Sequence, residues 1–247
     1  NSLESIENTA LEINPHFLQY AVVASITSKD TSNNLKIHTY FDNLMFRQYR
    51  NTNILNHSFV KSGLGLVLIC TYSDDNLPIS FQSIKKEIHE KLLDAGFTPS
   101  NFHIGISDAI LPLNNLNVSV IRARNANVVC QYEQLDMKLY SELGIYKYVM
   151  SIITNPILFQ EVEQHIQTLQ QYDDGHDSNL LDTLIVFIKN NGDYTKASEE
   201  LFQHANTIRY RVKKSEQIMN FTEGSSLEEL TMLIRCYLLH NVMMRNY

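Results

Sequence analysis

Long apolar runs and leader signals are missing from this sequence. No stretch approaches the roughly 18 apolar residues that a membrane helix needs, and the longest apolar segment, Leu64 to Cys70, has the length of a buried strand. The first residues, NSLESIENTALEI, contain three glutamates and no basic segment, which excludes a signal peptide. No initiator methionine is present, so we expect a fragment of a longer chain. These absences predict a cytoplasmic protein that does not enter a membrane.

Cysteine is scarce and metal-binding spacings are absent. Cys70, Cys130 and Cys236 are far apart, odd in number and set in apolar segments, which predicts buried free thiols in a reducing compartment. The chain has nine histidines, but the spacings H-x-x-x-H, C-x-x-C and H-E-x-x-H do not occur. We therefore predict neither a metal ion nor a cofactor.

The chain as a whole is acidic, with a net charge of −7, which argues against nonspecific binding to nucleic acid. The segment from Lys196 to Lys214 differs, because it holds five basic residues and two acidic ones. A basic face on an acidic chain is compatible with a DNA-reading module joined to an acidic partner domain.

Residues 20–135 alternate between strand and helix patterns, which predicts an α/β sandwich with helices on a mixed sheet. Strands are expected in QYAVVASIT, HSFVKSG, GLGLVLICTYS, FHIGISDAI and NVVCQYEQL, and helices in NNLKIHTYFDNLMFRQYRN, SFQSIKKEIHEKLLDAGF and NNLNVSVIRARNAN. In the second of these helices, Ile84, Ile88, Leu92 and Leu93 are expected to form one apolar stripe.

The pattern changes near residue 135, and from Met137 onward we expect only helices. The predicted organisation is a linker helix over 1–19, the α/β domain over 20–135, connecting helices over 136–178 and an all-α DNA-binding domain over 179–247. The fold class is therefore α+β.

Three short helical patterns follow one another between Leu180 and Ile218. The first ends at Asn191-Gly192, because glycine accepts the positive φ of a helix C-terminus. Asp193 or Thr195 is expected to cap the second, which ends at Phe202, and a tight turn leads to the third. The positions expected to be buried are Leu181, Leu184, Ile185 and Ile188 in the first helix, Ala197, Leu201 and Phe202 in the second, and Ile208, Val212 and Ile218 in the third. This spacing predicts a helix-turn-helix.

The outward face of the third helix is polar and basic. A recognition helix reads base edges mainly with its N-terminal residues, and backbone contacts come from basic side chains and helix N-termini. The candidate base readers are Asn206, Thr207, Arg209 and Tyr210, the candidate phosphate contacts are Lys196, Arg211, Lys213 and Lys214, and His204 completes the predicted DNA-binding set.

Short helices with basic faces are common, so the spacing alone leaves alternatives open. The basic helix could contact an acidic protein surface, as an interaction module, or the α/β domain could bind a nucleotide or second messenger. Another cluster, Asp173 to Asp177, has acidic and histidine side chains, but its spacing suits a metal poorly. Asp177 or Ser178 is expected to cap the next helix instead.

The amino-acid sequence of the C-terminal segment favours one of these alternatives, the DNA-binding module. LLDTLIVFIKNNGDYTKASEELFQHANTIRYRVKKSEQI resembles the C-terminal module of PucR/CdaR bacterial regulators, above all through the string LFQHANTIRYRV. YDDGHDSNLLDTL upstream and SSLEELTMLIRCYLLHN downstream are also similar, and Ser225 with Glu228, or Ser226 with Glu229, suits a capping box. Ala205 departs from the family, which usually has arginine or another polar residue there, and puts one DNA contact in doubt.

The resemblance implies a transcriptional regulator that is not an enzyme. Such a protein would bind a double-stranded DNA operator as a homodimer and respond to a small-molecule effector.

Residues 20–135 are similar to the degenerate GGDEF-like domain of CdaR-type regulators, with HIGISDAI and VVCQYEQL carrying the likeness. An active cyclase would need a GGDEF-type loop on the central hairpin to hold Mg²⁺ and the nucleotide. The sequence there is FVKSGLGLVLICTYSDDN, in which Asp74 and Asp75 are expected to be turn residues. Cyclase activity is therefore not expected.

Overall fold

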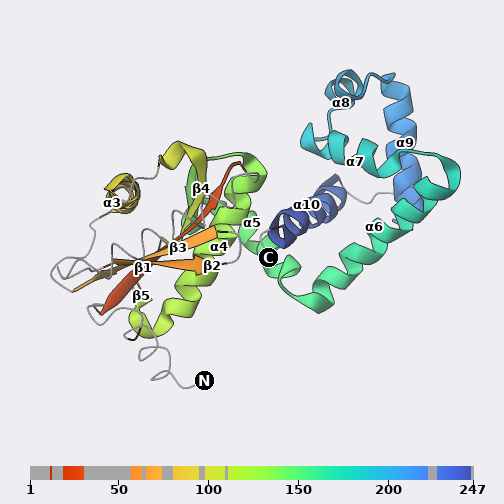
Figure 1. Cartoon of the computed structure of the whole chain (residues 1–247). Coiled ribbons are helices and arrows are strands. Elements are labelled where there is room, and N and C mark those ends of the chain that lie inside the picture. Colours follow the sequence, from red (N-terminus) through yellow and green to blue (C-terminus); the bar gives the residue numbers. More distant parts are fainter. Residues whose placement is uncertain are drawn as a thin grey trace. The chain divides into compact units, whose positions relative to one another are not determined.

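The computed structural model describes residues 12, 19–30, 57–62, 65–73, 80–94, 98–108, 111–221 and 227–245. The chain divides into two compact units (Figure 1), Asn1–Lys147 with Val242–Tyr247, and Tyr148–Asn241. Four predictions lie essentially outside the described residues: the linker helix over 1–19, the helix in NNLKIHTYFDNLMFRQYRN, the Asp74-Asp75 turn and the Ser225 or Ser226 capping box.

The first unit is built on a mixed sheet, as predicted. Its strands are β1 (Tyr20–Ser28), β2 (His57–Ser62), β3 (Gly65–Tyr72), β4 (Phe102–Ile106), β5 (Leu111–Pro112) and β6 (Met137–Leu139). They follow the order β2-β3-β1-β4-β6, with β5 also pairing with β1. The described pairings are antiparallel apart from the parallel pair of β4 and β6. Strands β2 and β3 form an antiparallel pair in which Ser62 lies opposite Gly65.

Alternate residues of the central strand β1 face opposite sides of the sheet, as the strand period of two requires. Val22, Ala24 and Ile26 pack in one core with apolar residues of α3 (Phe81–Asp94). Ala21 and Val23 pack in a second core with residues of α4 (Leu116–Glu133). The unit is therefore an α/β sandwich, which confirms the predicted fold class.

The α3 stripe is slightly narrower than predicted. Ile84, Ile88 and Leu92 are fully buried against the sheet, whereas Leu93 is half exposed. The prediction that Leu93 belongs to the stripe is therefore wrong.

The backbone of α4 lies directly on β4 at Gly105. A Cβ atom on Gly105 would lie 2.0 Å from the backbone nitrogen of Asn127 and 2.3 Å from the carbonyl oxygen of Ala123. The buried Asn127 side chain donates hydrogen bonds to the carbonyls of Ser25, at 3.0 Å, and His103, at 2.6 Å. Glycine at this position therefore sets how closely the helix approaches the sheet.

Two secondary-structure predictions at the end of this unit are wrong. NVVCQYEQL is not a strand, because α4 continues without a break to Glu133 and ends at Gln134, whose φ is 56°. Residues 126–130 are buried all around the helix, and an apolar run of this kind does not distinguish a buried helix from a strand. Nor is the chain purely helical from Met137, since β6 begins there and the short helix η5 (Tyr140–Leu143) follows.

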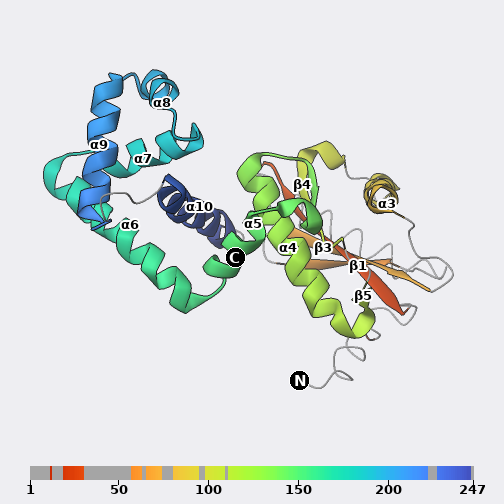
Figure 2. The same cartoon turned by 180° about the vertical axis from the view of Figure 1, so that it is seen from behind.

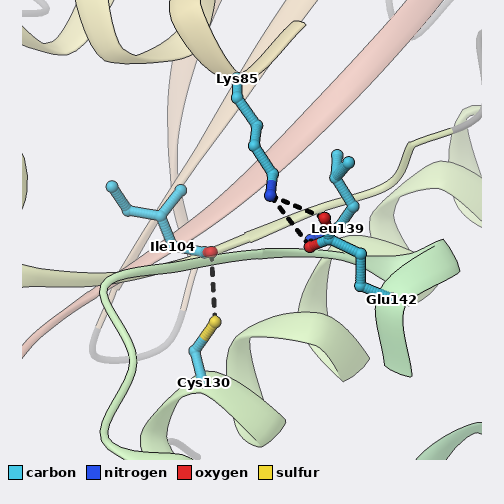
Figure 3. A network of polar contacts seen from close by, with 5 residues as sticks. All are labelled: Lys85, Ile104, Cys130, Leu139 and Glu142. Atoms are coloured by element: carbon cyan, nitrogen blue, oxygen red, sulfur yellow. Dashed lines mark hydrogen bonds and ion pairs between the residues drawn. The ribbon is translucent and has the colours of Figure 1, made fainter. Parts of the chain in front are cut away.

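Polar contacts anchor this last segment, and the compact unit accordingly extends to Lys147 rather than 135. The Lys85 ammonium lies 2.8 and 3.0 Å from the two carboxylate oxygens of Glu142, which also accepts from the Leu139 backbone N–H at 2.9 Å (Figure 3). The Cys130 thiol donates to the Ile104 carbonyl at 3.4 Å in the same view. These contacts connect η5 to α3 and β6, and α4 to β4.

The three cysteines are buried and form no disulfide, as predicted. Burial raises the pKa of the Cys130 thiol to about 12 and that of Cys236 to about 11, so neither is a thiolate at neutral pH. In the described part of the chain, no helix combines the length and the apolar character needed to cross a membrane.

The second unit is helical. Its elements are α5 (Tyr146–Ile153), which begins just before the unit, α6 (Pro156–His176), α7 (Leu180–Lys189), α8 (Tyr194–Leu201), α9 (Ala205–Ile218) and α10 (Leu227–Met244), whose last residues lie beyond it. The Asn155 side chain caps α6 by accepting from the N–H groups of Ile157 and Leu158. Phe159 of α6 stacks on His240 of α10 with ring centroids 3.8 Å apart. Helix α6 also packs on α7 and α9 (Figure 2), so it belongs to the same compact unit as these helices.

Candidate nucleic-acid interface

Helices α7, α8 and α9 pack on one another as a helix-turn-helix (Figures 1 and 2). The turn after α7 places Gly192 at φ 78°. The Asp193 side chain then accepts from the N–H groups of Thr195, at 2.8 Å, and Lys196, at 3.2 Å. Asp193 is therefore the cap of α8, which decides between the two predicted caps. The helix begins at Tyr194.

The start of α9 is fixed by His204, whose Nδ1 accepts from the backbone N–H of Asn206 at 3.2 Å. Histidine is not among the residues that usually cap helices, and no sequence pattern indicates this role. His204 is exposed, so it lies at the predicted DNA-binding end while its ring holds the first turn of α9 in place.

The inward face of α9 forms the core of this motif. Ile208 is fully buried and Val212 nearly so, together with Leu184 of α7 and Ala197 of α8. Most of the predicted core is confirmed, although Ile185, Leu201 and Ile218 are only half-buried. Sequence reasoning missed Met219, which directly follows α9 and is buried. The prediction for Phe202 is wrong, because its side chain is 93% exposed.

The outward face of α9 brings together four of the predicted DNA-binding residues. Asn206, Arg209, Tyr210 and Lys213 are exposed, and Thr207 beside them is half-buried. The Arg209 Nη1 donates to Asn206 Oδ1 at 3.1 Å, and its guanidinium lies 5.2 Å from the centre of the Tyr194 ring. These contacts hold the arginine over the N-terminal half of the helix, where base edges would be read.

Two predicted phosphate contacts turn toward the supporting helices. Arg211 is half-buried and donates through Nη1 to the Thr183 hydroxyl of α7 at 3.2 Å. Lys214 is also half-buried, and its ammonium lies 5.5 Å from the centre of the Tyr172 ring on α6. Lys196, in contrast, is exposed in the first turn of α8.

The N-terminus of α7 is capped from outside its own helix by Asp173. This carboxylate accepts from the N–H groups of Leu180, at 2.9 Å, and Leu181, at 3.0 Å, and from the Ser178 hydroxyl at 2.6 Å. Asp177 instead ends α6 with φ 48°. The prediction that Asp177 or Ser178 supplies the cap is therefore wrong, since the cap comes from the last turns of α6.

Replacing Asp173 with alanine is expected to lower the free energy of unfolding by about 1–2 kcal/mol, because buried N–H donors of α7 lose their acceptor. Urea unfolding followed by circular dichroism would measure the loss. Asp174→Ala is the matched control, because its exposed side chain should be replaceable at little cost. Equal midpoints for the two variants would contradict the capping role.

The comparisons with known proteins agree with this geometry. Residues 180–241 match the family described as the PucR C-terminal helix-turn-helix domain. The proline-responsive transcriptional activator PutR of Bacillus subtilis (strain 168) is 29% identical over 150 residues, which cover 59% of this chain and 35% of PutR. The DNA-binding transcriptional activator AdeR of the same organism is 32% identical over 101 residues, 41% of this chain and 24% of AdeR.

The chain thus matches about a third or less of each curated relative. Among solved structures, a regulator of polyketide synthase expression from Bifidobacterium adolescentis aligns over 93% of this chain and 87% of its own, with 13% identity and a TM-score of 0.33. A TM-score and a sequence identity this low do not establish that the two proteins share a fold or a function. The family match and the two relatives confirm the resemblance to PucR-type regulators, and residues 180–241 of this chain are a PucR-type C-terminal helix-turn-helix domain.

Proposed function

We propose that this chain is a sequence-specific, DNA-binding transcriptional regulator of the PucR/CdaR type, which reads the major groove with α9. The proposal rests on the two faces of α9, of which one is apolar and buried and the other is polar, basic and exposed. Ile208 and Val212 fix the helix in the helix-turn-helix core, while Asn206, Arg209 and Lys213 stay exposed on its outward face.

Each exposed group has a chemical counterpart on duplex DNA. The Arg209 guanidinium suits the O6 and N7 acceptors of guanine, and the Asn206 amide suits the N6 and N7 groups of adenine. Tyr210 and Thr207 offer hydroxyl groups to bases or phosphates, and Lys213 and Lys196 suit phosphates. Arg211 and Lys214 instead support the helix from behind, through Thr183 and Tyr172.

A single recognition helix contacts only a few base pairs, so we propose that the protein acts as a homodimer on two half-sites about one helical turn apart. The α/β unit would then be a degenerate GGDEF-like domain that relays a signal to the DNA-binding unit and catalyses no reaction. A small-molecule effector would supply that signal. The protein would act in the cytoplasm. PutR is named as proline-responsive, which makes amino acids a reasonable first class of effectors to test.

The deciding experiment is selection of duplex DNA by the purified chain from genomic fragments, followed by affinity measurements across a salt series. Enrichment of one sequence with two related half-sites is the expected result. Salt-dependent binding with no preferred sequence would contradict the proposal and would favour a basic interaction module. Tight binding of a guanine nucleotide without DNA selection would favour the second-messenger alternative.

Lys213→Ala is expected to weaken binding to all duplex sequences similarly, because a phosphate contact carries no sequence information. The slope of log K against log salt should become shallower by about 1, since one fewer counterion is released. Fluorescence anisotropy with the selected operator and a scrambled duplex measures both quantities. A loss confined to the operator would instead place Lys213 among the base-reading residues.

A further inference from the structure

Phe202 stands out in the turn between α8 and α9. Its side chain is 93% exposed, and its backbone adopts the left-handed conformation with φ 53°. In that position its backbone N–H closes the end of α8 by donating to the carbonyls of Ser198 and Glu199. The turn therefore needs this backbone conformation and makes no use of the phenyl ring.

Phenylalanine is an unfavourable residue for such a position. A side chain destabilises the left-handed conformation, which is why glycine or asparagine usually ends a helix in this way. In the described part of the chain, the other non-glycine residues with positive φ are all polar: Asp108, Gln134, Asp177, Asn191 and Asn220. Among the residues that the structure describes, Phe202 alone combines a strained backbone with an apolar side chain that gains nothing from burial.

The position of Phe202 in the motif suggests what the ring contacts. It lies two residues before His204, which caps α9, and four before Asn206, at the end of the helix where base edges would be read. A large apolar group there suits the apolar parts of duplex DNA, namely the C5-methyl of thymine and the deoxyribose.

We infer that Phe202 makes an apolar contact with the operator DNA and contributes to affinity or sequence preference beside the polar residues of α9. This inference rests on the proposed function. The phenyl ring then contributes to binding at some expense of folding stability, a compromise common at functional sites.

The test is a set of substitutions at Phe202, with operator affinity and the free energy of unfolding measured on the same samples. Phe202→Gly should leave the protein as stable as wild type or more stable, and should weaken operator binding about tenfold. The salt slope should stay the same, because no charge is lost. Phe202→Asn also suits the left-handed backbone, so its stability and operator affinity should match those of Phe202→Gly. Phe202→Tyr keeps the ring and should bind the operator nearly as tightly as wild type.

Gln134→Gly is the matched control, because Gln134 ends α4 with φ 56° in the other unit and is exposed. It relieves the same backbone strain and should not change DNA affinity. Replacing single operator thymines by deoxyuridine then separates the two apolar targets. A methyl contact predicts one position at which this replacement weakens wild type but not Phe202→Gly, and a sugar contact predicts none.

The outcomes separate the inference from the function on which it rests. If wild type selects an operator and Phe202→Gly binds it equally well, the inference is wrong and the proposed function stands. Unchanged operator binding with a loss of self-association would assign the ring to a protein contact and would also overturn it. If wild type selects no sequence, the proposed function fails and the inference fails with it.

Discussion

Replacing Arg209 with alanine is expected to weaken binding to the selected operator by about 1–3 kcal/mol, roughly 5- to 150-fold, and to relax the sequence preference at one position of each half-site. The guanidinium is exposed on the outward face of α9, and the Asn206 amide and the Tyr194 ring hold its orientation. An arginine that is already oriented loses less conformational entropy when it binds a guanine edge.

The control for this variant is Lys213→Ala, which removes the same charge from the same face of the helix. Repeating the selection with both proteins separates base reading from general attraction to phosphates. Arg209→Ala should change which sequences are enriched, whereas Lys213→Ala should not. Identical losses for the two variants on operator and scrambled DNA would show that Arg209 contacts phosphate only.

The helix-turn-helix could be predicted from sequence because its determinants are local. Gly192 and Asp193 mark the turn before α8, and the spacing of Ile208 and Val212 marks the buried face of α9. Each of these signals acts within about one helical turn of its own position. The motif could therefore be recognised without knowledge of its surroundings.

The features that were missed depend on distant parts of the chain. The cap of α7 comes from Asp173, seven residues before Leu180 and on a different helix. Strand β6 is defined by its parallel pairing with β4, more than thirty residues away in sequence. A buried helix such as the second half of α4 shows no alternation from which its type could be inferred.

The orientation of side chains on α9 was also beyond the sequence. Arg211 and Lys213 have similar chemistry and lie two residues apart, yet Arg211 turns to Thr183 while Lys213 is exposed. Helical spacing places Arg211 at the edge of the buried stripe, three residues after Ile208, but its hydrogen bond to Thr183 depends on the position of the neighbouring helix α7. Among the predicted DNA-binding residues of α9, the exposed ones are Asn206, Arg209, Tyr210 and Lys213.

The largest expected effect on stability is that of Gly105→Ala in the α/β unit. The added Cβ would lie 2.0 Å from the nitrogen of Asn127, 2.3 Å from the oxygen of Ala123 and 2.6 Å from the carbonyl carbon of Ala126. All three are backbone atoms of α4, so no side-chain rotation can relieve the clash. Helix and sheet must separate, which breaks the hydrogen bonds of the buried Asn127 amide as well. We expect a loss of about 3 kcal/mol or more in the free energy of unfolding.

Gly175→Ala provides the control, because a Cβ there meets no atom within 4 Å and the residue lies in the last turn of α6. Its stability should stay the same or rise by up to about 1 kcal/mol. Hydrogen exchange of the β4 and α4 amides, measured with thermal unfolding, would locate the damage in the Gly105 variant. Unchanged protection of these amides would show that α4 can move away from the sheet at little cost. If the α/β unit joins the two copies of the proposed homodimer, Gly105→Ala should lose tight binding to the two-half-site operator. Binding to a single half-site should survive, because Gly105 and α9 belong to different compact units.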